Sequence, residues 1–246
     1  MKKLLIMITK LRSRVKLTTT ILISLIVLNT HISFAETKNP FAGNYMGANL
    51  GRVDGDARSV EKATYNASNV GDYSPDGQVI NLFVGHNSNS LINDSFFFGT
   101  EFEFGKLNIR EEKQLPAFVG VRGDDSIAMT SSGRYFSPGL RFGLLKDNSN
   151  YFIKVGKVYS KIKQSFRDND TEGLTLVPQA ESSNLTGNSF GFGFEHFNDG
   201  LVYRAAFSKI NFGSQQMNTT SNAGGSFDFE DKLTLKIFSI GISKKF

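Results

Sequence analysis

The last segment of the chain, residues 232–246, limits the possible folds more than any other stretch. It reads KLTLKIFSIGISKKF, and its large apolar side chains recur at every second position. A period of two is typical of a β-strand, in which successive side chains point to opposite faces. One face carries Phe238, Ile240, Ile242 and Phe246, and the other carries small, mostly polar residues. This segregation predicts a barrel wall with lipid outside and a narrow polar interior.

Seven further segments alternate in the same way, which gives eight predicted strands. The eight segments are 44–53, 78–87, 96–107, 134–144, 151–161, 188–197, 201–212 and 232–246. Their lengths suit a tilted crossing of the hydrocarbon layer, which needs about 9–11 residues per strand. In 188–197, phenylalanines alternate with glycines and Glu195. A soluble barrel or a β-sandwich would bury the phenylalanines, so lipid is the predicted environment of that face.

The connections between the predicted strands alternate in length. The long ones are 54–77, 108–133, 162–187 and 213–231, and the short ones are 88–95, 145–150 and 198–200. Asn198-Asp199-Gly200 is itself a tight hairpin signal. Barrels of the outer membrane have short periplasmic turns and long extracellular loops. The sequence therefore predicts an all-β fold, an eight-stranded antiparallel transmembrane β-barrel in an up-and-down meander with both termini in the periplasm.

The first 35 residues have the features of a secretory signal peptide, with a basic start, an apolar run and small residues before a cleavage point. We expect cleavage near Ala35, which leaves residues 36–246 as the barrel domain. The signal holds six basic and no acidic residues, so its removal takes the formal charge from +5 to −1. A basic surface for nucleic acid is thus not predicted. The chain has no cysteine and three scattered histidines, and we predict no metal site and no cofactor.

Two segments carry a resemblance to a known family. The strand ending in Phe246 resembles the last strand of bacterial outer-membrane β-barrels, and residues 41–51, FAGNYMGANLG, resemble the opening strand of the opacity-protein-like and outer-membrane immunogenic proteins. These small barrels share the architecture of the OmpA transmembrane domain. The resemblance implies a location in the bacterial outer membrane and contact with its lipid and lipopolysaccharide. It also implies that the assembly machinery reads Phe238, Ile240, Ile242 and Phe246.

Strand parity predicts a cluster of charged side chains inside the barrel. The inward residues are Glu101, Glu103, Arg141, Lys154, Glu195 and Arg204. Charges in so narrow a space must be paired, because an isolated buried charge is costly. On neighbouring strands, Arg141 can pair with Glu101 or Glu103, and Glu195 can pair with Lys154 or Arg204. We expect these pairs to close the barrel.

One short motif raises the question of catalysis. His86-Asn87-Ser88-Asn89 resembles part of the active site of outer-membrane lipid A deacylases, but its place beside a short connection favours an interfacial turn. We therefore expect no enzyme. The favoured function is a surface barrel, an antigen with a structural or adhesive role whose loops meet a host or environmental ligand. A narrow diffusion pore and a lipid A-modifying enzyme are the alternatives. Asp124-Asp125 in a predicted loop is read as solvated, and Lys157 or Lys161 could meet lipopolysaccharide phosphates.

Overall fold

The computed structural model describes residues 39–61, 69–88, 95–114, 126–131, 133–167, 180–220 and 226–246. All of them belong to one compact unit, Asn39–Phe246. The expected signal peptide, residues 1–35, lies outside the described residues. Among the residues just given, no helix has the length and hydropathy that a membrane crossing requires.

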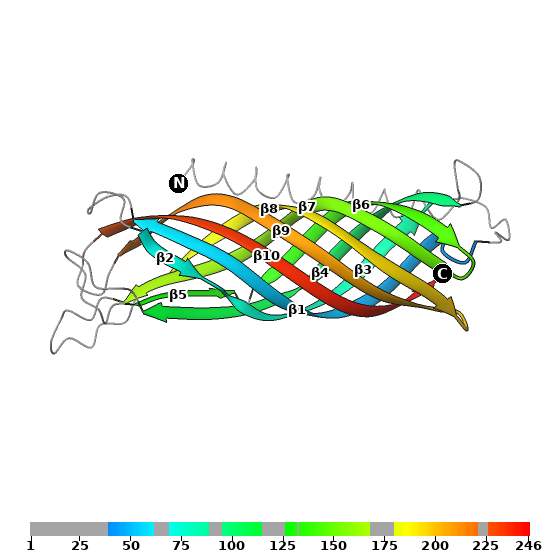
Figure 1. Cartoon of the computed structure of the whole chain (residues 1–246), viewed down its shortest axis with the longest axis horizontal. Helices are drawn as coiled ribbons and strands as arrows, with labels where there is room; N and C mark the ends of the chain where they lie inside the picture. The colour runs from blue at the N-terminus through cyan, green and yellow to red at the C-terminus, as the bar shows by residue number, and fades with distance from the viewer. Residues whose placement is uncertain are drawn as a thin grey trace, which may run out of the picture. The chain divides into compact units, whose positions relative to one another are not determined.

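The described residues form a closed, antiparallel β-barrel (Figure 1). Its segments are β1 (Gly43–Glu61), β2 (Asn69–Tyr73), β3 (Asp76–Asn87), β4 (Phe96–Gln114), β5 (Ser126–Ser131), β6 (Arg134–Lys146), β7 (Ser149–Arg167), β8 (Ala180–Asn198), β9 (Leu201–Thr220) and β10 (Ser226–Lys245). Both β2 and β3 pair with β1, and both β5 and β6 lie between β4 and β7, so ten segments make eight spans. Pairing of β10 with β1 closes the barrel, which confirms the predicted eight-stranded meander.

The short connections confirm the hairpin signals in the sequence. Between β8 and β9 the turn consists of Asp199 and Gly200, with φ angles of 49° and 81°. Two consecutive positive φ values define the type I′ turn, whose twist matches that of the flanking strands. Asp147, in the turn between β6 and β7, also has a positive φ, of 52°. Most of the predicted turn 88–95 lies outside the described residues.

The strands are longer than predicted, which corrects the boundaries of the long connections. β1 continues to Glu61, β4 to Gln114 and β7 to Arg167, and β10 begins at Ser226. Much of each predicted long loop is therefore paired strand. The prediction ended each strand where its outward residues stopped being apolar, although the period of two continues beyond that point.

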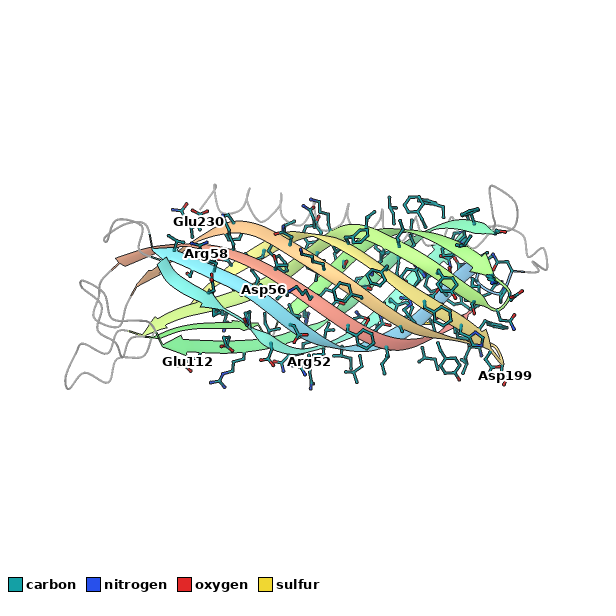
Figure 2. The ribbon with its side chains drawn as sticks, viewed as in Figure 1. Arg52, Asp56, Arg58, Glu112, Asp199 and Glu230 are labelled. Carbon is teal, nitrogen blue, oxygen red and sulfur yellow. The ribbon has the colours of Figure 1, made fainter. Side chains whose placement is uncertain are left out.

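The outward face divides the barrel into two sections. On β4 the outward residues run from Phe96 to Phe104 and then change to Lys106, Asn108 and Arg110. The span from Phe96 to Phe104 covers about 27 Å along the strand and about 20 Å along the axis at a tilt of roughly 40°, close to the ~25 Å apolar band of such barrels. We call the part with the apolar outward face the membrane section and the rest the loop-side section. Figure 2 shows the charged residues Arg52, Asp56 and Arg58 on the loop-side section.

The interior changes in the opposite direction to the outward face: it holds charged side chains in the membrane section and apolar side chains in the loop-side section. The loop-side section is filled by one apolar cluster, made of Val53, Ala57, Tyr73, Val79, Leu107, Ile109, Tyr135, Val158, Ile162, Leu185, Ile210, Phe212, Leu233, Leu235 and Ile237. The prediction of a polar lumen is therefore wrong for this section. With charged residues outside and apolar residues inside, the loop-side section follows the rule for a barrel in water, whereas the membrane section follows the rule for a barrel in lipid.

Candidate functional site: a charged cluster inside the barrel

The six charged residues predicted to face inward all lie inside the membrane section. Glu101 and Glu103 come from β4, Arg141 from β6, Lys154 from β7, Glu195 from β8 and Arg204 from β9. Five of them are buried, with Arg141 at 0% and Glu101 at 1% relative exposure. The three carboxylates and three cations balance in formal charge, and the structure brings all six into one network.

Glu101 is the centre of this network because it contacts all three cations. Its Oε2 lies 3.3 Å from Nη1 of Arg141 and 2.8 Å from Nη2 of Arg204, and its Oε1 lies 3.2 Å from Nζ of Lys154. The hydroxyl of Tyr45 donates a hydrogen bond of 2.9 Å to the same carboxylate and accepts one of 2.6 Å from Arg141. Charge-assisted bonds of this kind are roughly twice as strong as neutral ones.

Glu195 is the second junction of the network. Its carboxylate accepts a 2.7 Å bond from Nε of Arg204, lies 2.9 Å from Nη2 of Arg141, and accepts a 2.6 Å bond from Asn150. Lys154 instead pairs with Glu101 and Glu103. The expected alternative of a Glu195–Lys154 pair is therefore not the observed one. Arg141 pairs with Glu101, which is one of the two partners predicted for it.

Aromatic rings enclose the two arginines. The guanidinium of Arg141 lies 4.1 Å from the ring centroid of Phe152, and that of Arg204 lies 4.0 Å from the centroid of Phe83. Cation–π contacts gain strength where water is excluded. These rings and Tyr45 are not among the predicted inward residues, although strand parity places the rings inside: Phe83 and Phe152 lie between residues assigned to the outward face.

Glycines make room for the inward rings. A Cβ atom on Gly193 would lie 2.5 Å from the Phe152 ring, and one on Gly47 would lie 2.5 Å from the Phe83 ring. Real Cβ atoms do not approach other atoms so closely. Glycines on β1 and β8 thus leave the space that the inward rings from β3 and β7 fill.

The network continues toward the loop-side section as a chain of polar groups. The Tyr135 hydroxyl donates to Glu103 at 3.3 Å, Asn81 donates to Tyr135, and Asn49 donates to Asn81 at 2.9 Å. Beyond Asn49 the interior becomes the apolar cluster described above. The polar chain therefore ends at a mainly apolar layer, in which Asp231 is a further buried carboxylate that accepts hydrogen bonds from Ser59 and Tyr73.

The opposite end of the network is covered by the start of the described chain. Phe41 and Ala42 are buried, and the Asn87 side chain donates a 2.9 Å hydrogen bond to the Phe41 carbonyl. A cavity of about 10 Å³ remains between Phe41, Arg141 and Glu195, which is room for about one water molecule. Side chains of the described residues thus fill the interior at three levels along the barrel axis.

The C-terminal residues take the positions that the alternation predicts. Phe238, Ile240, Ile242 and Phe246 face outward, with Phe238 at 57% exposure. The backbone N–H of Phe246 donates a 3.0 Å hydrogen bond to the carbonyl of Asn44, so the final residue takes part in closing the barrel. Recognition of these residues by the assembly machinery stays a prediction.

The histidines and aspartates considered for chemistry have other contacts. His86 lies 2.8 Å from the side-chain oxygen of Asn44, and the Ser88 hydroxyl donates to the carbonyl of Phe98. His196, on the outward face, contacts Ser149. In the described part of the chain, no group of three or more potential ligands could hold a metal ion. Asp124 and Asp125 lie outside the described residues.

Comparison with known proteins identifies the fold. No family model and no curated protein matches the sequence. Among solved structures, the outer membrane protease OmpT from Escherichia coli matches with a TM-score of 0.53 at 8% identity, over 89% of this chain and 100% of that one. Ail, the attachment invasion locus protein of Yersinia pestis, matches with 0.39 at 11% (82% and 99% covered), and Neisserial surface protein A with 0.38 at 10% (83% and 98%). The match to OmpT shows the fold alone: this chain is a closed, eight-stranded antiparallel β-barrel whose fold is similar to that of an outer-membrane protein.

Proposed function

We propose that this protein is a sealed surface barrel of the bacterial outer membrane, whose function is carried by the end with the long connections. The observation that carries this proposal is the closed interior: a cap at Phe41, a paired charge cluster and an apolar layer follow one another along the axis. A barrel of eight strands has an interior just wide enough for its own side chains. The loop-side section remains as the part able to meet a partner, in a structural or adhesive role.

The proposed location and partners follow from the outward face. Exposed phenylalanines and leucines circle the membrane section, and such a band is typical of the lipid-facing surface of outer-membrane barrels. We propose that the chain lies in the outer membrane after cleavage near Ala35, in contact with lipid and lipopolysaccharide. We also propose that the strand ending in Phe246 is the segment read by the assembly machinery, and that a host or environmental ligand binds at the loops.

The alternative of a diffusion pore is separated from this proposal by conductance. The refolded chain in a planar bilayer is expected to show no stable open level, because paired charges and an apolar layer block the axis. A known channel protein, measured in the same lipid and over the same voltage range, serves as the positive control. A reproducible open level of nanosiemens size would contradict the sealed barrel and establish the pore.

The proposed orientation is tested with single cysteines, because the natural chain has none. Arg58→Cys lies in the loop-side section, and Asn198→Cys lies at the opposite end beside Asp199 (Figure 2). A membrane-impermeant maleimide applied to intact cells is expected to label only Arg58→Cys, and both variants are expected to react once the cells are opened. Labelling of only Asn198→Cys in intact cells would mean that the barrel is inverted.

The contacts of the motif 86–89 do not favour catalysis on lipid A. His86 and Ser88 lie at the end with the short connections and contact Asn44 and Phe98 rather than each other. A general base must reach the proton that it removes, at about 2.6–3.2 Å or through one water molecule. The proposal therefore keeps a non-enzymatic function.

A further inference from the structure

The boundary between the two sections carries a belt of basic residues. Each of the eight spans has one outward polar residue at the loop-side end of its apolar stretch, and on β7 the outward ring of Tyr159 lies one step further toward the loops. The polar residues are Arg52, Gln78, Lys106, Arg134, Lys157, Asn188, Lys209 and Lys236, all exposed. Six of the eight are Lys or Arg and none is acidic. At the opposite boundary the corresponding described residues are Asn44, His86, Lys146, Ser149, His196, Leu201 and Lys244, of which two are basic. The excess of cations is thus confined to one membrane interface.

Three of the six cations of this belt already have a partner in the protein. Arg52 lies 3.3 Å from Asp54, and Lys236 lies 2.7 Å from Asp56. Lys157 donates a hydrogen bond to Asn188. These contacts leave a smaller set of cations for an external ligand.

Lys106 and Arg134 form an uncompensated pair. They lie directly opposite each other in the register of β4 and β6. Like charges at such positions repel, and among the described residues neither side chain has an acidic partner. The comparable pair Lys209 and Lys236 is compensated by Asp56. An anion bound between Lys106 and Arg134 would remove the repulsion.

Aromatic rings lie directly below this pair on the same outward face. Phe104 precedes Lys106 by two residues, and Phe136 follows Arg134 by two. Their ring centroids are 5.1 Å apart, and the Tyr159 ring stacks on Phe136 at 6.2 Å and 19°. Phe104 and Tyr159 are 44% and 46% exposed. A cationic pair above an apolar platform fits a ligand with an anionic head and an apolar body.

We propose that Lys106 and Arg134 bind a phosphate group of a phosphorylated lipid of the outer leaflet, with the acyl region against Phe104, Phe136 and Tyr159. Arginine presents a fork that matches two phosphate oxygens, and lysine adds a point charge. Free phosphate would use the cations and leave the rings unused, which favours the lipid. This inference rests on the proposed outer-membrane orientation, since it places the belt at the outer leaflet.

The test compares two double variants of the refolded full-length chain in zwitterionic micelles, with bisphosphorylated lipid A as the probe. Bound lipid is measured by native mass spectrometry. Lys106→Gln/Arg134→Gln is expected to weaken binding at least about tenfold, which corresponds to about 1.4 kcal/mol. The control Lys209→Gln/Lys236→Gln removes the same charge from the opposed pair that Asp56 compensates, and it is expected to change binding less than about threefold. Unchanged resistance to heat unfolding in detergent shows that each variant is folded.

Two further probes fix the chemistry of the ligand. Lipid A without its phosphates is expected to bind the natural chain and Lys106→Gln/Arg134→Gln equally weakly, and inorganic phosphate is expected not to compete at millimolar concentration. Equal loss in both double variants would overturn a defined site in favour of general charge attraction. Tight binding of dephosphorylated lipid A would overturn phosphate recognition, and competition by inorganic phosphate would overturn the lipid as the source. Failure of the orientation itself would appear separately, as inverted labelling of Arg58→Cys and Asn198→Cys.

Discussion

Replacement of Glu101 by Gln is expected to lower the free energy of unfolding by about 3–5 kcal/mol, the cost of removing one partner from a buried ion pair. Glu101 contacts Arg141, Lys154 and Arg204 and is 1% exposed, so its loss leaves three buried cations with less negative charge than they need. Glutamine keeps the shape of the side chain, which separates charge from packing. Urea unfolding in the presence of lipid vesicles gives the measurement.

Asp54→Asn is the matched control for Glu101→Gln. Asp54 also pairs with an arginine, Arg52, but both side chains are more than half exposed. An exposed pair contributes about 0–1 kcal/mol, so this variant is expected to stay within about 1 kcal/mol of the natural chain. The double variant Glu101→Gln/Lys154→Met should lose less than the sum of its single changes, because the two residues share one network. Small and additive losses would show that the cluster is solvated rather than buried.

Leu235→Ala is expected to cost about 2–5 kcal/mol, the range for truncating a large side chain in a packed core. Leu235 is fully buried in the apolar cluster of the loop-side section, where it faces Gly55 of β1 and Ile210 of β9. The loss combines the transfer of the removed atoms to water with the cavity that they leave. Urea unfolding in lipid vesicles again measures the effect.

Lys232→Ala, on the outward face of the same strand, is the control and is expected to change stability by less than about 0.5 kcal/mol. The pair of variants tests whether the loop-side section is a packed barrel in water. If Leu235→Ala and Lys232→Ala were equally mild, the section would be loosely packed, and the apolar layer would no longer support a sealed axis.

Strand parity, the number of spans and the order of the barrel were predictable because each depends on local pattern. Phe190, Phe192 and Phe194 alternate with small residues whatever the rest of the chain does, and the direction of every second side chain follows from the extended backbone. The same rule placed Glu195 and Arg204 inside. It did not find where the strands end, because the prediction treated an apolar outward face as part of the definition of a strand.

The sequence by itself determined the eight spans, the face on which each residue lies and the identity of the inward charges. Only the tertiary structure decided which charges meet. Glu101 on β4 and Arg204 on β9 are not neighbours in the sheet, and they meet across the interior at 2.8 Å. Their meeting depends on the stagger between strands, which closure of the barrel fixes. The apolar filling of the loop-side section was also decided by the tertiary structure, for a different reason: the outside of that section is charged and meets water, so the inward side of β1 and β10 forms the apolar core.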